Sequence, residues 1–78
     1  MENESPVMQC AMILVMYEIG AARDCLHSAI IWAEVESELS HNIVKHLMDE
    51  YHLHVRIAYA LNELFGTPIS VYNCIRAL

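Results

Sequence analysis

Apolar residues fill the first part of the chain almost without interruption. Between Val7 and Gly20, in the segment VMQCAMILVMYEIG, only Gln9 and Glu18 are plainly polar. A helix that is apolar on nearly every side is typical of an element buried on several sides. The preceding Ser5-Pro6 is a helix start, because serine caps free N–H groups and proline fits the first helical position.

The apolar spacing stays helical beyond Gly20. Apolar residues recur every three or four positions, at Ala22, Cys25, Leu26, Ala29, Trp32, Ala33, Val35 and Leu39. A single glycine inside a helix costs only about 1 kcal/mol against alanine. We therefore predict a first helix over residues 6–38, leaving open a kink or break at residues 20–24. Ser40-His41-Asn42 is the best turn after it, since serine and asparagine favour caps and turns.

A second helix is predicted over residues 42–65. Its apolar stripe has steps of three and four residues, at Val44, Leu47, Met48, Tyr51, Val55, Ala58, Leu61 and Phe65. Gly66 is a natural C-cap. Thr67-Pro68 repeats the start signal of Ser5-Pro6, so a short third helix is expected over residues 68–77.

These elements predict an all-α single domain over residues 1–78, a long helical hairpin followed by a short C-terminal helix. At 1.5 Å per residue the two long helices would measure about 45 and 36 Å, which is long for so small a chain. Elongated hairpins of this kind assemble into four-helix bundles as oligomers. If Gly20 breaks the first helix, the alternative is a compact orthogonal four-helix bundle.

The amino-acid composition indicates more apolar surface than a single copy of the chain can bury. Of the 78 residues, 56% are hydrophobic, whereas an average globular protein has about 45–50%. A chain this short buries only about 60–65% of its unfolded surface. We expect a homo-oligomer, a dimer first, or a larger protein partner. The residues predicted for this interface are flexible methionines, aromatic anchors and one histidine: Met8, Met12, Met16, Trp32, Tyr51 and His54.

The charge and the cysteine content indicate which partners and which cellular compartment this chain is suited to. The net charge is −6 with only four lysines and arginines, which argues against nucleic acid as a partner. The apolar run is shorter than the about 20 residues of a membrane span, and its acidic flank is unlike a secretion signal. Three cysteines without a CxxC pattern indicate reduced thiols in the cytoplasm.

No catalytic motif is present in the sequence. Two glycines in the whole chain cannot build a phosphate-binding loop, and no nucleophile motif is found. We therefore predict neither an enzyme nor a resident cofactor. The favoured function is a protein–protein interaction module, such as an adaptor, a small chaperone or an inhibitor of a larger protein.

An alternative comes from Glu18 on the first helix, Asp49-x-x-His52 on the second, and the ending NELFGTP. This arrangement resembles half of a ferritin-like bundle. The resemblance implies a metal site formed by two hairpins, with Glu18, Asp49 and His52 as ligands. A turn at Ser40 would place Glu18 opposite about residue 62, whereas this site needs a turn near residue 34.

Two further readings concern His54 and the C-terminal tail. His54 lies beside the apolar stripe, where an interface histidine would make association sensitive to pH. The tail IAYALNELFGTPISVYNCIRAL resembles a helix-turn-helix, which implies a DNA-binding regulator as a third alternative. Its last helix offers only Asn73 and Arg76 among apolar neighbours, a pattern that favours packing over base contacts.

Overall fold

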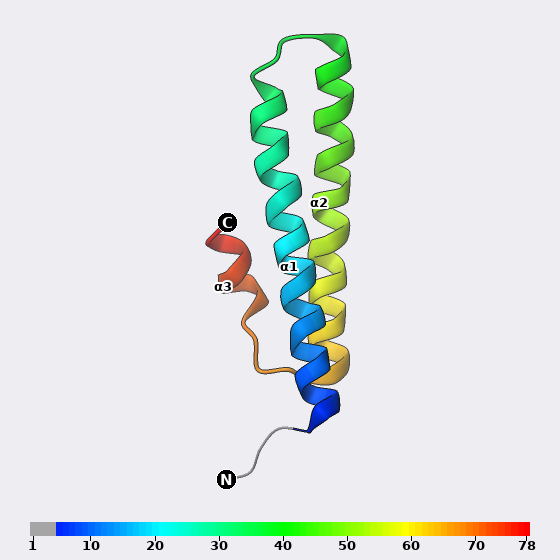
Figure 1. The fold of residues 1–78 in the computed structure, drawn as a ribbon, viewed down its shortest axis with the longest axis vertical. Helices are drawn as coiled ribbons and strands as arrows, with labels where there is room; N and C mark the ends of the chain where they lie inside the picture. Colours follow the sequence, from blue (N-terminus) through cyan, green and yellow to red (C-terminus); the bar gives the residue numbers. More distant parts are fainter. Residues whose placement is uncertain (1–4) are drawn as a thin grey trace.

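The computed structural model describes residues 5–78, which form three helices joined by short loops. Helix α1 spans Pro6–Ala33, α2 spans Glu38–Phe65 and α3 spans Val71–Arg76. The two long helices run antiparallel, and α3 lies beside one end of them (Figure 1). The predicted all-α hairpin with a short C-terminal helix is confirmed.

Helix α1 is continuous through its glycine. The Ser5 hydroxyl accepts the Met8 N–H at 3.1 Å, which caps the first turn. Gly20 lies in the middle of the helix without a positive φ. The break considered at residues 20–24 is therefore absent, and the orthogonal four-helix bundle that depended on it is wrong. A lone glycine is tolerated there because the surrounding residues favour helix.

The turn between the long helices comes earlier than the sequence predicted. Instead of a turn at residues 40–42, residues 34–37 connect α1 to α2. Ser37 is the N-cap of α2, and its hydroxyl accepts the Ser40 N–H at 3.1 Å while the Ser40 hydroxyl accepts the Ser37 N–H at 3.1 Å. The Ser40 hydroxyl also donates to the Val35 carbonyl. This capping box fixes the start of α2, so the predicted boundaries at residues 38 and 42 are wrong.

Helix α2 ends at Gly66, whose φ of 65° places it in the left-handed region that favours glycine. The third helix then starts later than the predicted residue 68. The Thr67 hydroxyl donates to the Asn62 side-chain oxygen, and the Asn62 Nδ2 donates to the Ile69 carbonyl at 3.0 Å. Asn62 thus holds residues 67–69 outside a helix, and Ser70 caps α3 instead.

The core lies where the three helices meet. Val15 and Ile19 of α1, Ala58 of α2 and Val71 of α3 form its buried cluster. The molecule is nonetheless elongated, with extents of 55 × 18 × 17 Å and a radius of gyration of 15.2 Å. A compact domain of this length would have a radius of gyration of about 11.5 Å. The hairpin therefore exposes most of its length to solvent on both sides.

Candidate interaction surface

The core of one copy is thin. Only seven apolar side chains are buried among the described residues, and four of them are alanines: Ala11, Val15, Ile19, Ala22, Ala29, Ala58 and Val71. Alanines let the two long helices approach closely, but they bury little apolar area. Many of the large apolar side chains are therefore left on the outside of the hairpin.

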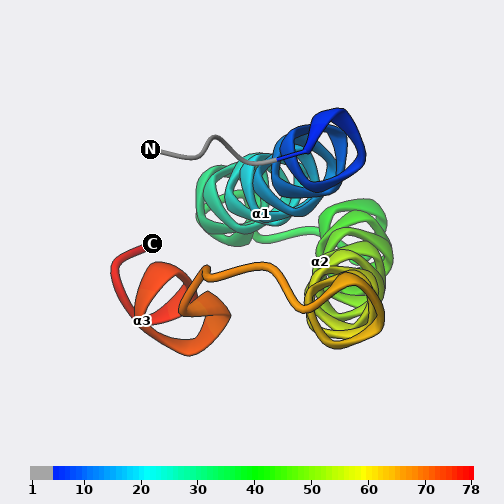
Figure 2. The same ribbon diagram turned by 90° about the horizontal axis from the view of Figure 1, so that it is seen from below.

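Helix α3 covers only one side of the hairpin. It packs against the side of α1 that carries Met16, Ile19 and Arg23, and the end-on view shows no helix of residues 5–78 on the opposite side (Figure 2). Successive residues of a helix are turned by about 100°, so Leu14 and Glu18 face this opposite side. We call it the open face.

The open face carries a regular stripe on each long helix. The stripe positions follow one another in steps of three and four residues, the spacing of coiled-coil contacts. On α1 they are Val7, Cys10, Leu14, Glu18, Ala21, Cys25, Ser28 and Trp32. On α2 they are Leu39, Ile43, His46, Glu50, Leu53, Ile57, Leu61 and Leu64. None of these sixteen side chains is buried and twelve are apolar, so the stripes form a largely apolar surface that is at least partly exposed to water.

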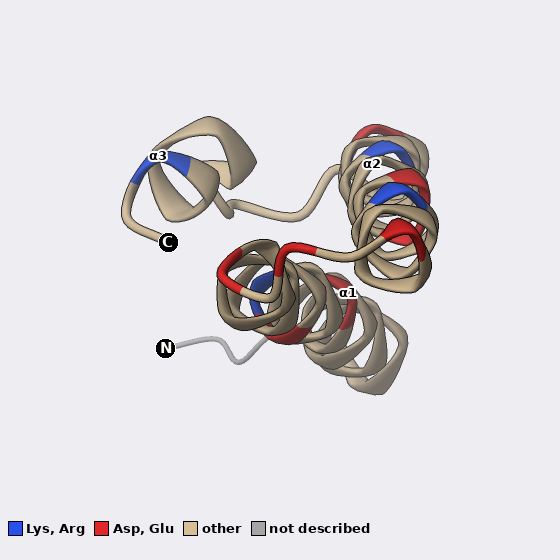
Figure 3. Cartoon of the chain, turned by 90° about the horizontal axis from the view of Figure 1, so that it is seen from above, with Lys and Arg blue, Asp and Glu red and all other residues tan. Residues whose placement is uncertain are grey.

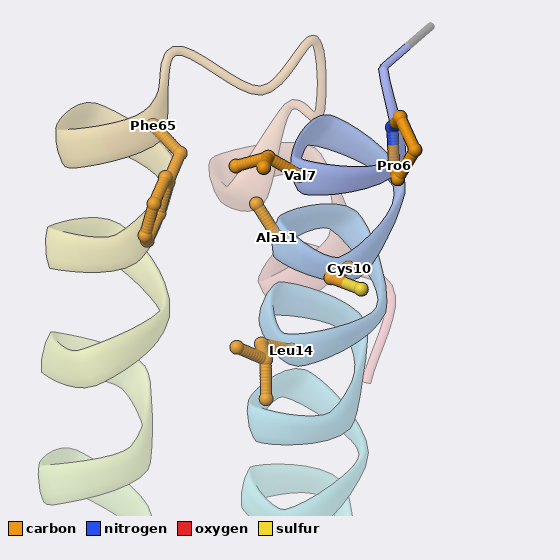
Figure 4. Close-up of a pocket in the computed structure, with 6 residues that line it drawn as sticks. All are labelled: Pro6, Val7, Cys10, Ala11, Leu14 and Phe65. Carbon is orange, nitrogen blue, oxygen red and sulfur yellow. The ribbon is translucent and has the colours of Figure 1, made fainter.

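The free ends of the two long helices leave an apolar pocket on this face. Figure 4 views the pocket from the open face, with α3 behind the hairpin. Its walls come from the first turns of α1 and the last turn of α2: Pro6, Val7, Cys10, Ala11, Leu14 and Phe65. No polar side chain lines the pocket, so an inserted apolar side chain would meet only carbon and sulfur atoms.

A polar cluster interrupts the open face near the middle of both helices. The His54 Nδ1 lies 2.6 Å from the Glu18 Oε1 across the two helices. The His54 Nε2 lies 3.8 Å from the Glu50 Oε1, one turn earlier on α2. The exposed side-chain fractions are 16% for Glu18, 23% for His54 and 41% for Glu50. We call these three residues the Glu–His–Glu cluster; it has a net negative charge whether or not the imidazole is protonated.

The charge of the cluster reaches a neighbouring thiol. Burial is the main cause that raises the pKa of Cys25, and the carboxylates of Glu50 and Asp24 raise it further. Cys25 belongs to the α1 stripe, whereas Glu50 belongs to the α2 stripe. The negative field of Glu50 therefore acts across the gap between the helices.

Acidic groups dominate the rest of the surface as well. Seen from the turn, the glutamates of residues 34–38 are in the foreground, and α3 carries a single basic band, from Arg76 (Figure 3). The Arg76 guanidinium lies 5.6 Å from the centre of the Tyr72 ring. The stripes themselves contain no lysine or arginine, so no cation on the open face balances the cluster.

The structure does not bring together the ligands predicted for a metal site. Asp49 bonds to the Lys45 ammonium at 2.9 Å and is exposed, as is His52. Lys45 holds the pKa of the Asp49 carboxyl below its usual range, mainly through this hydrogen bond. Glu18 instead meets His54, because the turn at residues 34–37 places these two residues opposite each other. Within residues 5–78, no three His, Cys, Asp or Glu side chains are arranged to hold a metal ion.

The residues predicted for the interface do not share one face. Met16 lines a groove against α3, and Met8 and Met12 are half-buried. Four-residue steps turn by about 40°, so this methionine row drifts away from the open face. Trp32 and His54 lie on the open side, while Tyr51 is half-buried between the helices. Whether any of them contacts a partner stays a prediction.

The helix-turn-helix alternative depended on the last helix. In the structure this helix has six residues, and Ser70 caps its Asn73 N–H at 3.3 Å. Val71 is buried in the core, while Cys74 and Ile75 pack against it. The role of α3 seen here is to cover one side of the hairpin, and DNA binding stays a prediction.

Sequence reasoning missed Glu50 and the second stripe. A signal was present, because Ile43, Glu50, Ile57 and Leu64 follow one another at steps of seven residues. The stripe through Val44, Tyr51 and Ala58 was regular enough to be taken as the whole contact surface. That stripe packs within the hairpin. Leu61 belongs to both stripes and packs against the buried cluster, whereas the other residues of the second stripe stay outside it.

The chain matches no protein family model, no curated protein and no solved structure. In the part of the chain that the structure describes, no helix has the length and apolar character needed to cross a membrane. The open face is therefore the feature from which a function is argued.

Proposed function

We propose that this chain is a small helical protein–protein interaction module that acts through its open face. The face would pair with a complementary helical surface, either a second copy or a larger protein. The observation that carries the proposal is the pair of stripes, in which twelve of sixteen unburied positions are apolar. Contiguous exposed apolar surface of this kind marks interaction sites on soluble proteins.

The size of the face supports this role. The whole molecule measures 55 × 18 × 17 Å, so one long side of it spans on the order of 1,000 Å², and a standard interface buries about 800 Å² per partner. Helices that pair in coiled coils have apolar stripes with this spacing. Each apolar side chain of one helix inserts between four side chains of the partner helix. The role is one of binding, as in an adaptor, a small chaperone or an inhibitor. Free thiols at Cys10, Cys25 and Cys74 favour a cytoplasmic setting.

Light scattering on a size-exclusion column, over a range of protein concentrations, tests the proposal. We expect the wild-type mass to rise toward a dimer as the concentration increases. Leu14→Gln should weaken association at least about tenfold, because each copy loses the burial of one leucine, worth roughly 1.5–3 kcal/mol. Metal analysis of the same peak shows whether an ion is bound to the assembly.

Ile13→Gln is the matched control. Ile13 is 66% exposed and Leu14 48% exposed on the same helix, but Ile13 points away from the open face. Circular dichroism should show full helix content for both variants. A wild-type protein that remains monomeric at all concentrations would contradict pairing with a second copy. An equal loss in the two variants would contradict the role of the open face.

A further inference from the structure

The Glu–His–Glu cluster has a fixed place on the open face. Glu18 and Glu50 each lie within two residues of the middle of a 28-residue helix. If two copies pair through their open faces about a two-fold axis parallel to the helices, equivalent residues of the two copies lie at the same height along that axis. A two-fold axis that lies in the plane of the interface and runs across the helices, through the centre of the face, brings equivalent residues to the same height only near the middle. Either pairing of two complete open faces therefore brings the two clusters together.

A second copy is the occupant that fits this face best. It offers a helical hairpin of identical length, and two-fold pairing is the commonest symmetry of soluble oligomers. Its α2 stripe supplies large side chains such as Leu53 and Ile57, and its α1 stripe includes small ones such as Ala21 and Ser28. The area of the face also meets the needs of a stable dimer, as estimated above.

Pairing of the two clusters is opposed by their charge. Each cluster has two carboxylates and one imidazole, which leaves two negative charges with neutral His54 and one with protonated His54. Glu18 faces His54 from α1, and Glu50 faces it from α2. The Cys25 thiol lies near Glu50, and His46 is one turn before Glu50 on α2; α3 lies on the other side of the hairpin. No lysine or arginine is on the stripes, and burying like charges together is unfavourable.

We propose that a second copy of this chain covers the open face, and that the paired Glu–His–Glu clusters take up protons when the dimer forms. The dimer therefore becomes tighter as the pH falls. Histidine is the side chain that ordinarily changes charge between about pH 5 and 8, which places the response near neutral pH. This inference rests on the proposed interaction role, since it names the partner and the control of the same face.

Sedimentation equilibrium at pH 6 and pH 8 tests the inference, at constant salt and with EDTA in every buffer. Each proton taken up per dimer changes the dissociation constant by about tenfold per pH unit. We expect the dissociation constant to be at least about tenfold lower at pH 6 than at pH 8. Glu50→Gln should tighten the dimer at pH 8 and flatten its pH dependence, because it removes one charge from each cluster.

Two matched controls separate the cluster from the general acidity of the chain. Glu63→Gln removes the same charge from an exposed position of α2 outside the stripes and should keep the wild-type pH dependence. His52→Gln removes an exposed imidazole of α2 outside the stripes and should also keep it, whereas His54→Gln should flatten it. Circular dichroism verifies the fold of each variant.

The outcomes distinguish the two proposals. A dimer whose affinity does not change with pH, or equal effects of Glu50→Gln and Glu63→Gln, overturns proton uptake at the cluster and leaves the interaction role standing. A dimer that forms only when a metal ion replaces EDTA overturns it as well. A monomer at both pH values and at every concentration overturns the second copy and the self-association on which it rests.

Discussion

The lysine and arginine side chains lie outside the stripes of the open face, and two of them form ion pairs there. Lys45 pairs with Asp49 and Arg23 with Asp24, both on exposed positions. Glu18 and Glu50 have only His54 between them. Of these residues, Glu18 and His54 could be singled out from the sequence, one as an acid in an apolar helix and the other as a histidine beside a stripe. Their contact could not, because it depends on a turn at residues 34–37 instead of the predicted residues 40–42.

The Asp49–Lys45 pair gives a prediction about a single ionisable group. Lys45→Met should raise the pKa of the Asp49 carboxyl toward its usual range, since it removes the hydrogen bond and the charge that lower it. In the wild type Asp49 therefore stays ionised to lower pH, and any stability from the pair is lost as the pH falls through the lowered pKa. NMR titration of the side-chain carboxyl carbon measures this shift.

His52→Gln is the control for the effect of Lys45→Met on the pKa of Asp49. His52 contributes the weakest of the effects that lower this pKa, so its removal should shift the titration less than Lys45→Met does. A titration curve of Asp49 that is identical in the wild type and in Lys45→Met would rule out the hydrogen bond as the cause.

At the scale of the elements, helix type was easier to predict than helix ends. Periodic apolar positions indicated two long helices, and the structure contains them. The turn was misplaced because Glu34, Glu36 and Glu38 read equally well as the solvent-facing side of a helix. What decides the boundary is the reciprocal bonding of Ser37 and Ser40, in which a second serine takes the place usually held by glutamate or glutamine.

The two glycines should respond to alanine in opposite ways. Gly20→Ala should stabilise the fold by up to about 1 kcal/mol, because alanine favours helix and an added Cβ meets nothing within 4 Å. Gly66→Ala should destabilise it by about 1 kcal/mol or more, because φ is 65° there and alanine is strained in the left-handed region. Urea unfolding followed by circular dichroism measures both changes, and shifts of the same sign would contradict the assigned backbone conformations.

At the scale of the whole molecule, the sequence was sufficient to predict a hairpin but not its free side. The stripe used to predict contact was the one that closes the hairpin, through Ala58. Which side α3 covers depends on the Asn62 bonds to Thr67 and Ile69, and these have no periodic signature. The open face is the side of the hairpin on which α3 does not pack, so its identification required the structure.

Pairing through the open face fixes the shape of the dimer. Two hairpins side by side keep a length close to the 55 Å of one copy, whereas end-to-end association would nearly double it. Small-angle X-ray scattering of the dimer should therefore give a longest dimension only slightly greater than that of the monomer. A dimer close to twice as long as the monomer would show that the helix ends, rather than the open face, form the contact.

Glu18 and His54 lie opposite each other across the hairpin, and this register has a consequence for the order in which the chain folds. Contacts near the turn join residues that are close in sequence, whereas Val7 and Phe65 share a pocket although 58 positions separate them. Closing a short loop costs less entropy than closing a long one. We therefore expect the hairpin to form from Ser37 outward, with the Val7–Phe65 end last. Helix α3 can dock only afterwards, because its Val71 packs against Val15 and Ala58 from both long helices.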